Sequence, residues 1–227
     1  MFERILEEKN KIMIAFLLIA TGVLGRLFLF NMLPNTPEIY LTMNGITQHM
    51  FMLDIFFLLA VISILSGLLL GGYYTLMIPL TAMIISDLII GNTYILLFTW
   101  SGFALLGLIG YLLKSKNCLT MKKIPTILGA SIGGILLYDL WTNFGCWLGW
   151  YPKTISGLGL CYTYAAPFTL WHLLSTTLAL TIVIIPILYL KEHKKLQINI
   201  QSKPIEKPVI IAVPAVLMIL AILTLVV

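Results

Sequence analysis

Residues 56–113 read FFLLAVISILSGLLLGGYYTLMIPLTAMIISDLIIGNTYILLFTWSGFALLGLIGYLL, a run in which Asp87 is the single charged side chain. Two short breaks divide this run, Gly71-Gly72 and Gly91-Asn92, and each fits a tight turn in which glycine relieves the backbone. A helix needs about 20 consecutive apolar residues to cross a bilayer. The run therefore predicts three neighbouring transmembrane helices joined as hairpins, over residues 50–71, 73–91 and 93–114.

The rest of the chain has the same apolar character. Hydrophobic residues occupy 60% of the 227 positions and charged residues 10%, whereas a soluble domain has about 25% charged residues. This composition excludes a soluble fold. Four further stretches have spanning length, over residues 11–31, 125–147, 167–190 and 209–227. We predict an all-α, polytopic transmembrane helical bundle whose first span is retained rather than cleaved as a signal peptide.

The last predicted span differs from the others. Residues 209–227 contain Pro214 but no charged or aromatic side chain, and the preceding segment is polar. We predict a six-span membrane core over residues 1–190, a cytoplasmic linker over residues 191–208 and one appended helix over residues 209–227.

The basic residues of the connections predict the orientation. Three precede the first span, four lie in the fourth connection and five follow the sixth span, which gives twelve on one side against Lys153 alone on the other. The positive-inside rule places the N-terminus in the cytoplasm and, if the seventh span crosses, the C-terminus outside the cell membrane. Because the basic residues are scattered over short loops, the formal charge of +5 does not indicate a nucleic-acid partner.

The three cysteines give no metal or redox motif. Cys118, Cys146 and Cys161 have neither C-x-x-C spacing nor paired histidines nearby. Cys146 and Cys161 fall on the outer side, where a disulfide is chemically permitted, but nothing in the sequence fixes the distance between them.

Five ionisable residues fall within the predicted spans: Arg26, Asp54, Asp87, Asp139 and His172. A charge at the centre of a spanning helix costs about 2.5–3.5 kcal/mol on insertion scales, so each of these residues is a candidate functional group. With the orientation above, all five fall in the outer half of the membrane, where they can line one cavity open to the outside. As structural alternatives, Arg26 can form an ion pair with Asp54 or Asp87, and His172 can be a hydrogen-bonded packing residue.

A polar stripe is predicted on the fifth span. Asp139, Asn143 and Trp147 recur at intervals of four, which places them on one helix face. All five tryptophans, Trp100 among them, fall in the outer half, either as an interfacial belt or beside the carboxylates. Aromatic faces beside carboxylates suit a flat ring or an ammonium group.

We therefore predict a substrate-binding site and no catalytic residue, cofactor or metal site. The residues of the predicted site are Asp87, Asp139, Asn143 and Trp147, followed by Arg26, Asp54, Trp100 and His172. Three acids against one arginine favour a cationic or amine-bearing ligand, unless burial protonates one of the acids.

Two blocks of sequence carry a resemblance to a known group of proteins. The first is GGYYTLMIPL at residues 71–80 with SDLIIG at residues 86–91; the second is TNFGCW at residues 142–147, followed by YPKT at 151–154 and APF at 166–168. These blocks are similar to an uncharacterised prokaryotic membrane family that is grouped with the substrate-specificity (S) components of energy-coupling-factor (ECF) transporters. The resemblance covers about residues 11–190, and the seventh helix exceeds the six spans usual in that group.

The resemblance implies a membrane-embedded capture subunit for a vitamin-like or other micronutrient small molecule. It also implies a transmembrane coupling protein and two ATPase subunits as partners, besides the lipid bilayer. The chain has no G-x-x-x-x-G-K-[ST] loop, so any energy must come from those partners.

Two other classes of function stay open at this point. One is an intramembrane enzyme in which Asp54, Asp87, Asp139 and His172 form an acid–base set or bind a divalent metal, although the chain has neither an H-E-x-x-H nor a G-x-S-x-G motif. The other is a non-transporting membrane assembly protein in which the charges are structural pairs.

Overall fold

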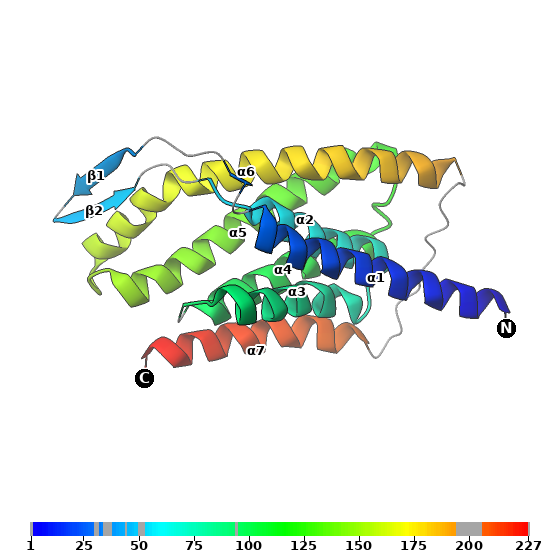
Figure 1. Ribbon diagram of the computed structural model, residues 1–227, viewed down its shortest axis with the longest axis horizontal. Helices are drawn as coiled ribbons and strands as arrows, with labels where there is room; N and C mark the ends of the chain where they lie inside the picture. The colour runs from blue at the N-terminus through cyan, green and yellow to red at the C-terminus, as the bar shows by residue number, and fades with distance from the viewer. Residues whose placement is uncertain are drawn as a thin grey trace.

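The computed structural model describes residues 2–29, 32–33, 38–43, 45–49, 53–93, 95–193 and 206–226. These residues form an all-α bundle with one small β-hairpin (Figure 1). The helices are α1 (Phe2–Phe28), α2 (Phe56–Leu65), α3 (Tyr74–Ile90), α4 (Leu96–Ser115), α5 (Ile124–Trp150), α6 (Ile155–Glu192) and α7 (Glu206–Val226), with a π-helix η2 (Ser66–Leu70) and a 3-10 helix η3 (Met121–Lys123).

The lengths and apolarity of the helices are those of a multi-pass membrane protein. Five segments of the described chain are long and apolar enough to cross a membrane: Glu8–Phe28, Leu96–Ser115, Met121–Trp150, Ile155–Glu192 and Lys207–Thr224. The helical segments Phe56–Leu70 and Tyr74–Ile90 are apolar but shorter. The N-terminal end of α1, the end of α6 and the beginning of α7 lie at one end of the bundle, and the C-terminus lies at the other (Figure 1).

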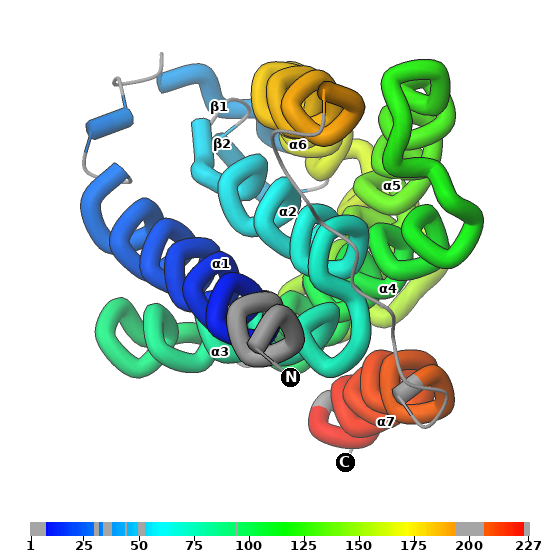
Figure 2. The backbone as a smooth tube through the Cα atoms, turned by 90° about the vertical axis from the view of Figure 1, so that its right-hand side faces the viewer, coloured from blue at the N-terminus to red at the C-terminus, as the bar shows by residue number. Residues whose placement is uncertain are grey.

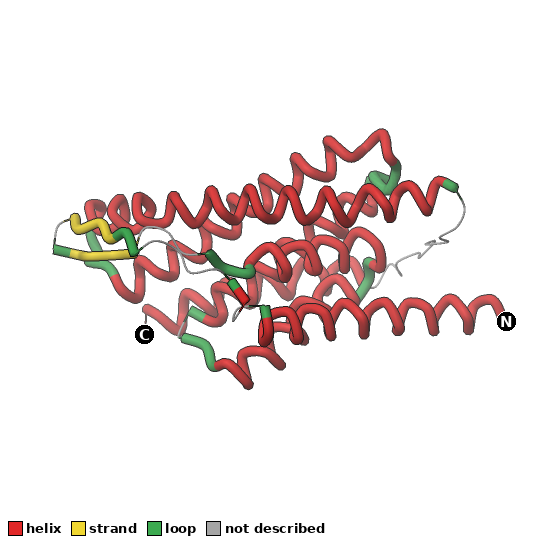
Figure 3. Tube along the Cα trace, turned by 45° about the horizontal axis from the view of Figure 1, so that its top comes forward, coloured by secondary structure: helices red, strands yellow, loops and turns green. Residues whose placement is uncertain are grey.

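The connection before α2 contains regular structure that the sequence did not reveal. Strands β1 (Tyr40–Met43) and β2 (Ile46–His49) pair antiparallel, with Tyr40 opposite His49. Gly45 in the turn has φ of +79°, a conformation that favours glycine. Figure 3 shows the two strands beyond one end of the helices, which makes this hairpin end distinct from the end where the N-terminus lies.

Helix α6 begins earlier than the predicted span at residues 167–190. It starts at Ile155, where Thr154 is the N-cap and its Oγ1 accepts a hydrogen bond from the Gly157 backbone N–H at 3.1 Å. Residues 155–166 include two glycines and four hydroxyl-bearing residues besides their apolar side chains, which lowers their mean hydropathy and hides the helix from a search for apolar runs. Most of the predicted outer connection is therefore helical.

Glycines bring the second and fourth helices into backbone contact. A Cβ at Gly67 in η2 would lie 2.1 Å from the carbonyl oxygen of Gly107, and a Cβ at Gly110 would lie 2.1 Å from that of Ile64. Small residues at such crossings let helix backbones approach closely in a membrane. The packing fixes α4 against the α2–η2 segment.

The bundle has one main apolar core built from α2, α4, α5 and α6. Its fully buried members include Ile64, Leu106, Ile135 and Leu180. Helix α7 packs against α4 and α5 (Figure 2), with Ile210 and Ala221 buried. That residues 1–190 form a core independent of α7 stays a prediction.

Candidate functional site

A cavity of about 540 Å³ lies among the first six helices. Its walls receive at least one residue from each of α1 to α6 or from the segments that flank them, and none of the described lining residues comes from α7. The lining residues are Arg26, Leu27, Asp54, Ile55, Phe56, Leu59, Met83, Ile90, Asn92, Thr99, Phe103, Tyr138 and His172. A small-molecule site of this volume is typically an apolar pocket with a few convergent polar groups, which is the composition found here.

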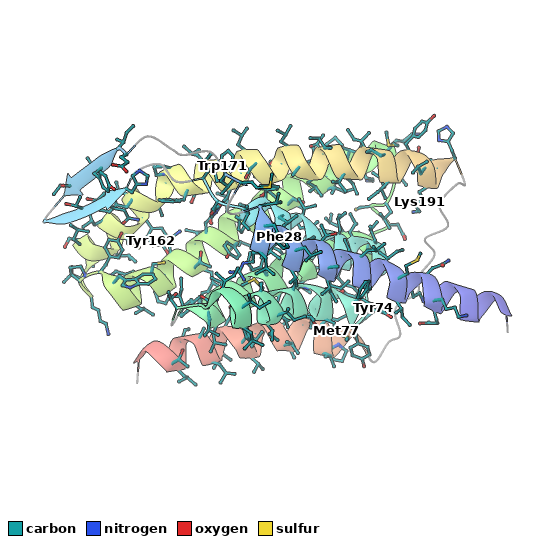
Figure 4. The ribbon with its side chains drawn as sticks, viewed as in Figure 1. Phe28, Tyr74, Met77, Tyr162, Trp171 and Lys191 are labelled. Carbon is teal, nitrogen blue, oxygen red and sulfur yellow. The ribbon has the colours of Figure 1, made fainter. Side chains whose placement is uncertain are left out.

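The cavity lies toward the hairpin end of the bundle. Arg26 is in the last turn of α1, Asp54 precedes α2 and Asn92 follows α3. Figure 4 shows Phe28 and Trp171 nearer to the β-hairpin, whereas Tyr74 and Lys191 lie toward the opposite end. The cavity therefore occupies one half of the bundle.

An ion pair between α1 and α3 forms one polar cluster of this half. Arg26 Nη1 donates to Asp87 Oδ1 and, at 2.7 Å, to Ser86 Oγ. The other Asp87 oxygen accepts hydrogen bonds from Asn92 Nδ2 and, at 2.7 Å, from Trp100 Nε1. Asp87 is buried, and both of its carboxylate oxygens accept hydrogen bonds, so the structure contains the Arg26–Asp87 ion pair considered from the sequence. A ligand contact at Asp87 stays a prediction.

Close helix packing positions Arg26. Gly25 precedes it, and a Cβ at Gly25 would lie 2.2 Å from Leu58 Cδ2 on α2. One turn earlier, a Cβ at Gly22 would lie 3.2 Å from Ala82 Cβ on α3. These glycines allow the end of α1 to cross α2 and α3 at short range, which brings the guanidinium to Asp87.

A second polar cluster consists of Asp54, His172 and Asp139, here named the carboxylate–imidazole triad. His172 Nε2 lies 2.7 Å from Asp54 Oδ2, and His172 Nδ1 lies 2.7 Å from Asp139 Oδ1. The His172 ring stacks on Phe56 with a centroid distance of 4.0 Å. The imidazole of His172 thus joins α6 to α5 and to the segment that precedes α2.

The two carboxylates of the triad have different surroundings. Asp54 Oδ1 accepts from the backbone N–H of Phe56, the first residue of α2, at 3.1 Å, and it also accepts from Trp171 Nε1 at 3.2 Å. The Asp54 side chain is 37% exposed, whereas that of Asp139 is 6% exposed. Asp139 Oδ2 is buried and has no hydrogen-bond partner among the described residues. A buried polar atom without a partner is costly and marks a place of chemical interest.

The predicted polar stripe on α5 does not form one surface. Asp139 contacts His172, whereas Asn143 Nδ2 donates to the Asp139 backbone carbonyl at 2.7 Å and Trp147 Nε1 donates to that of Pro152 at 2.9 Å. Asn143 lines a separate cavity of about 290 Å³. Trp147 is absent from the described walls of both cavities. A ligand contact by Asn143 or Trp147 stays a prediction.

The second cavity lies beneath the β-hairpin and contains two thiols. Its wall includes Gln48, Asn143, Cys146, Tyr151 and Cys161. Tyr151 Oη donates to Gln48 Oε1, which joins the hairpin to the α5–α6 turn. Cys146 and Cys161 are both free in the structure, so they do not form the disulfide considered from the sequence.

Sequence reasoning missed the aromatic wall of the main cavity. Phe56 has ring-centroid distances of 4.7 Å to Tyr138 and 5.7 Å to Phe103. Tyr138 directly precedes Asp139, and Phe56 lies two residues after Asp54, so their nearness to candidate acids was a usable signal. Asn92 and Thr99 were also missed, and their only signal was their place around a predicted outer turn.

The triad is not arranged as a metal site. Each imidazole nitrogen of His172 is engaged by a different carboxylate, so the three side chains do not turn their lone pairs toward one point. Within the described part of the chain, no group of three or more His, Cys, Asp or Glu side chains has the geometry to hold a metal ion.

The chain belongs to a family of unknown function, DUF6580, whose family model matches residues 7–198. The match extends over α1 to α6 and ends before α7. No curated protein and no solved structure matches the chain.

Proposed function

We propose that this chain is a membrane-embedded capture subunit that binds a vitamin-like or other micronutrient small molecule from the outer side of the cell membrane. The main cavity is the observation that carries the proposal. Its volume of about 540 Å³ lies in the range of small-molecule sites, and all six helices of the family-matched region contribute to its wall.

The distribution of apolar and basic side chains supports an outward-facing cavity. Toward the N-terminal end of the bundle, the space between helices is filled by buried side chains such as Leu68, Ile127 and Leu188. At that same end, Lys191 Nζ donates to the Leu119 carbonyl at 3.0 Å, so the basic connection between α4 and α5 lies there as well. If this connection is cytoplasmic, as the positive-inside rule predicts, the cavity lies in the outer half.

Energy for release of a captured molecule would come from partner chains. The sequence has no phosphate-binding loop, and its two motif blocks resemble those of ECF S components. We therefore include a transmembrane coupling protein and two ATPase subunits in the proposal. In this arrangement the six-helix core holds the site, and α7, outside the family match, is an addition to it.

The triad also gives a specific reason to consider an intramembrane acid–base enzyme. Asp54 and His172 both line the cavity and lie 2.7 Å apart, within the reach needed for proton transfer. Turnover of a candidate substrate, lost in His172→Gln, would favour this function over capture. A bound molecule recovered chemically unchanged favours capture.

Small molecules retained by the purified protein test the proposal. The protein is isolated in mild detergent, and its bound compounds are identified by mass spectrometry. Thr99→Trp places a large side chain into the cavity wall, whereas Leu112→Trp alters an exposed position of the same helix. We expect one compound retained in near-stoichiometric amount by the parent and by Leu112→Trp, and lost from Thr99→Trp. Equal retention by all three, or by none, would contradict capture in this cavity.

A further inference from the structure

We propose that the molecule captured in the main cavity is an organic monocation with an aromatic or apolar body, and that its charged group binds at Asp54. This inference rests on the proposed function, and it concerns the chemical class of the ligand. It follows from a count of protons in the carboxylate–imidazole triad and from the charges around the cavity.

The hydrogen bonds of the triad fix its number of protons. A neutral imidazole has one N–H and one lone pair, and an ionised carboxylate only accepts. Both nitrogens of His172 lie 2.7 Å from a carboxylate oxygen, so each of the two contacts needs its own proton. The second proton makes the ring an imidazolium or one carboxyl neutral. In either arrangement the triad keeps a single negative charge.

No other lining residue in the described part of the chain compensates this charge. Arg26 lines the cavity, but its guanidinium is paired with Asp87, so these two charges cancel. Tyr138 is a neutral phenol, and the remaining described lining residues carry no charge. An uncompensated negative charge within a membrane is costly, and a bound cation removes that cost.

Asp54 is the acid of the triad that a ligand can reach. Its side chain lines the cavity and is 37% exposed, whereas Asp139 is buried and is not among the described lining residues. Two Asp54 contacts, from the Phe56 N–H and Trp171 Nε1, are longer than 3.0 Å and leave acceptor capacity for another donor. A ligand ammonium at this carboxylate adds a charge-assisted hydrogen bond.

The aromatic and aliphatic side chains of the cavity wall suit an aromatic or apolar body. Phe56, Phe103 and Tyr138 form a contiguous group of rings, and Leu59 and Met83 extend the apolar surface. Aromatic faces attract both flat rings and cations. The site therefore combines one anionic group with a largely apolar enclosure.

A set of three indoles tests the charge preference, because its members share one ring system. Binding of tryptamine (cationic), tryptophol (neutral) and indole-3-acetate (anionic) is measured on the full-length protein at pH 7 by isothermal titration calorimetry. A charged hydrogen bond is worth roughly tenfold or more in affinity, so we expect tryptamine to bind about ten times more tightly than tryptophol, and indole-3-acetate to bind most weakly.

Asp54→Asn identifies the group responsible. The amide oxygen of an Asn side chain also accepts, so the hydrogen bond from the Phe56 N–H is kept while the charge is removed. We expect the tryptamine preference over tryptophol to fall to about one in Asp54→Asn and to stay unchanged in Cys146→Ser, which alters the second cavity.

Binding of tryptophol or indole-3-acetate that is tighter than binding of tryptamine would overturn the cationic ligand class. A retained compound that is neutral or anionic would overturn it as well. In both cases the proposed capture function would still stand. A preference for tryptamine that survives in Asp54→Asn overturns the assignment of Asp54. If no indole binds and no compound is retained, the proposed function fails together with this inference.

Discussion

The imidazole of His172 on α6 lies 2.7 Å from the carboxylate of Asp139 on α5, and the same ring lies 2.7 Å from Asp54 ahead of α2. This histidine joins three segments at the wall of a cavity that six helices share. A separate cluster around Asp87 holds α1 against α3. The five ionisable residues singled out from the sequence thus form two clusters. Both carboxylate oxygens of Asp87 accept hydrogen bonds in one, and Asp139 Oδ2 has no partner among the described residues in the other.

We expect the loss of one charge of the Arg26–Asp87 ion pair to destabilise the protein more than the loss of both charges. Asp87→Leu leaves the guanidinium without its acid and is expected to lower the free energy of unfolding by about 3 kcal/mol. The double variant Arg26→Met with Asp87→Leu should recover most of that loss. Reversible unfolding in mixed detergent micelles gives the free energy of unfolding of the parent, the single variant and the double variant. A double variant as unstable as the single one would show that the pair is not a coupled unit.

Glycine at the crossing of α4 and α2 should be indispensable. In Gly110→Ala the new Cβ would lie 2.1 Å from the Ile64 carbonyl oxygen, so the helices must separate, and we expect a loss of about 1–3 kcal/mol or more. Gly129→Ala on α5 is the matched control, because nothing lies within 4 Å of the added methyl group. Melting temperatures of the two purified variants give the comparison. A Gly110→Ala protein as stable as Gly129→Ala would contradict the close contact.

Removal of residues 194–227 should leave the six-helix core intact. This cut removes α7, which lies outside the family match and contributes no described residue to the main cavity. Its buried residues Ile210 and Ala221 face α4 and α5, and lipid can cover the apolar surface that they leave. We expect a monodisperse protein in size-exclusion chromatography. Aggregation of the shortened chain, with the full chain monodisperse, would make α7 part of the core.

Orientation is tested by the accessibility of engineered cysteines. In a variant with Cys118, Cys146 and Cys161 replaced by serine, a membrane-impermeant maleimide should label Gly45→Cys in the hairpin turn and spare Lys122→Cys in η3. Both positions are exposed. Gly45 lies in the hairpin turn, whereas η3 lies beside the end of α6, where the Met121 N–H donates to Glu192 Oε1. Labelling of Lys122→Cys alone in intact cells would place the cavity in the inner half.

The helices were predictable because a segment that crosses a bilayer needs a long apolar run, and its backbone N–H and C=O groups must hydrogen-bond within the protein. The same rule fails at residues 155–166, where α6 continues through a stretch of lower hydropathy, and at the β-hairpin, whose strands are four residues each. The beginning of α6 at the Thr154 cap depends on a single hydrogen bond that composition does not reveal.

The ionisable residues of the two polar clusters were predictable from the sequence, whereas their pairing and the aromatic wall of the cavity were not. The cost of intramembrane charge singled out Arg26, Asp54, Asp87, Asp139 and His172, and these residues form both polar clusters. Their partners depend on helix rotation, which the sequence does not fix. Four residues advance an α-helix by about 400°, so Trp147 is turned by roughly 80° from Asp139, and the predicted stripe divides between different surroundings.

The position of a bound molecule tests the capture site most directly. A cryo-electron microscopy structure of the protein saturated with tryptamine, bound to a rigid antibody fragment for alignment, would locate the ligand. We predict density in the main cavity, with the ammonium within hydrogen-bonding distance of Asp54 and the indole against Phe56. Density in the second cavity beside Asn143 and Tyr151, or an empty main cavity at saturating tryptamine, would contradict the proposed site.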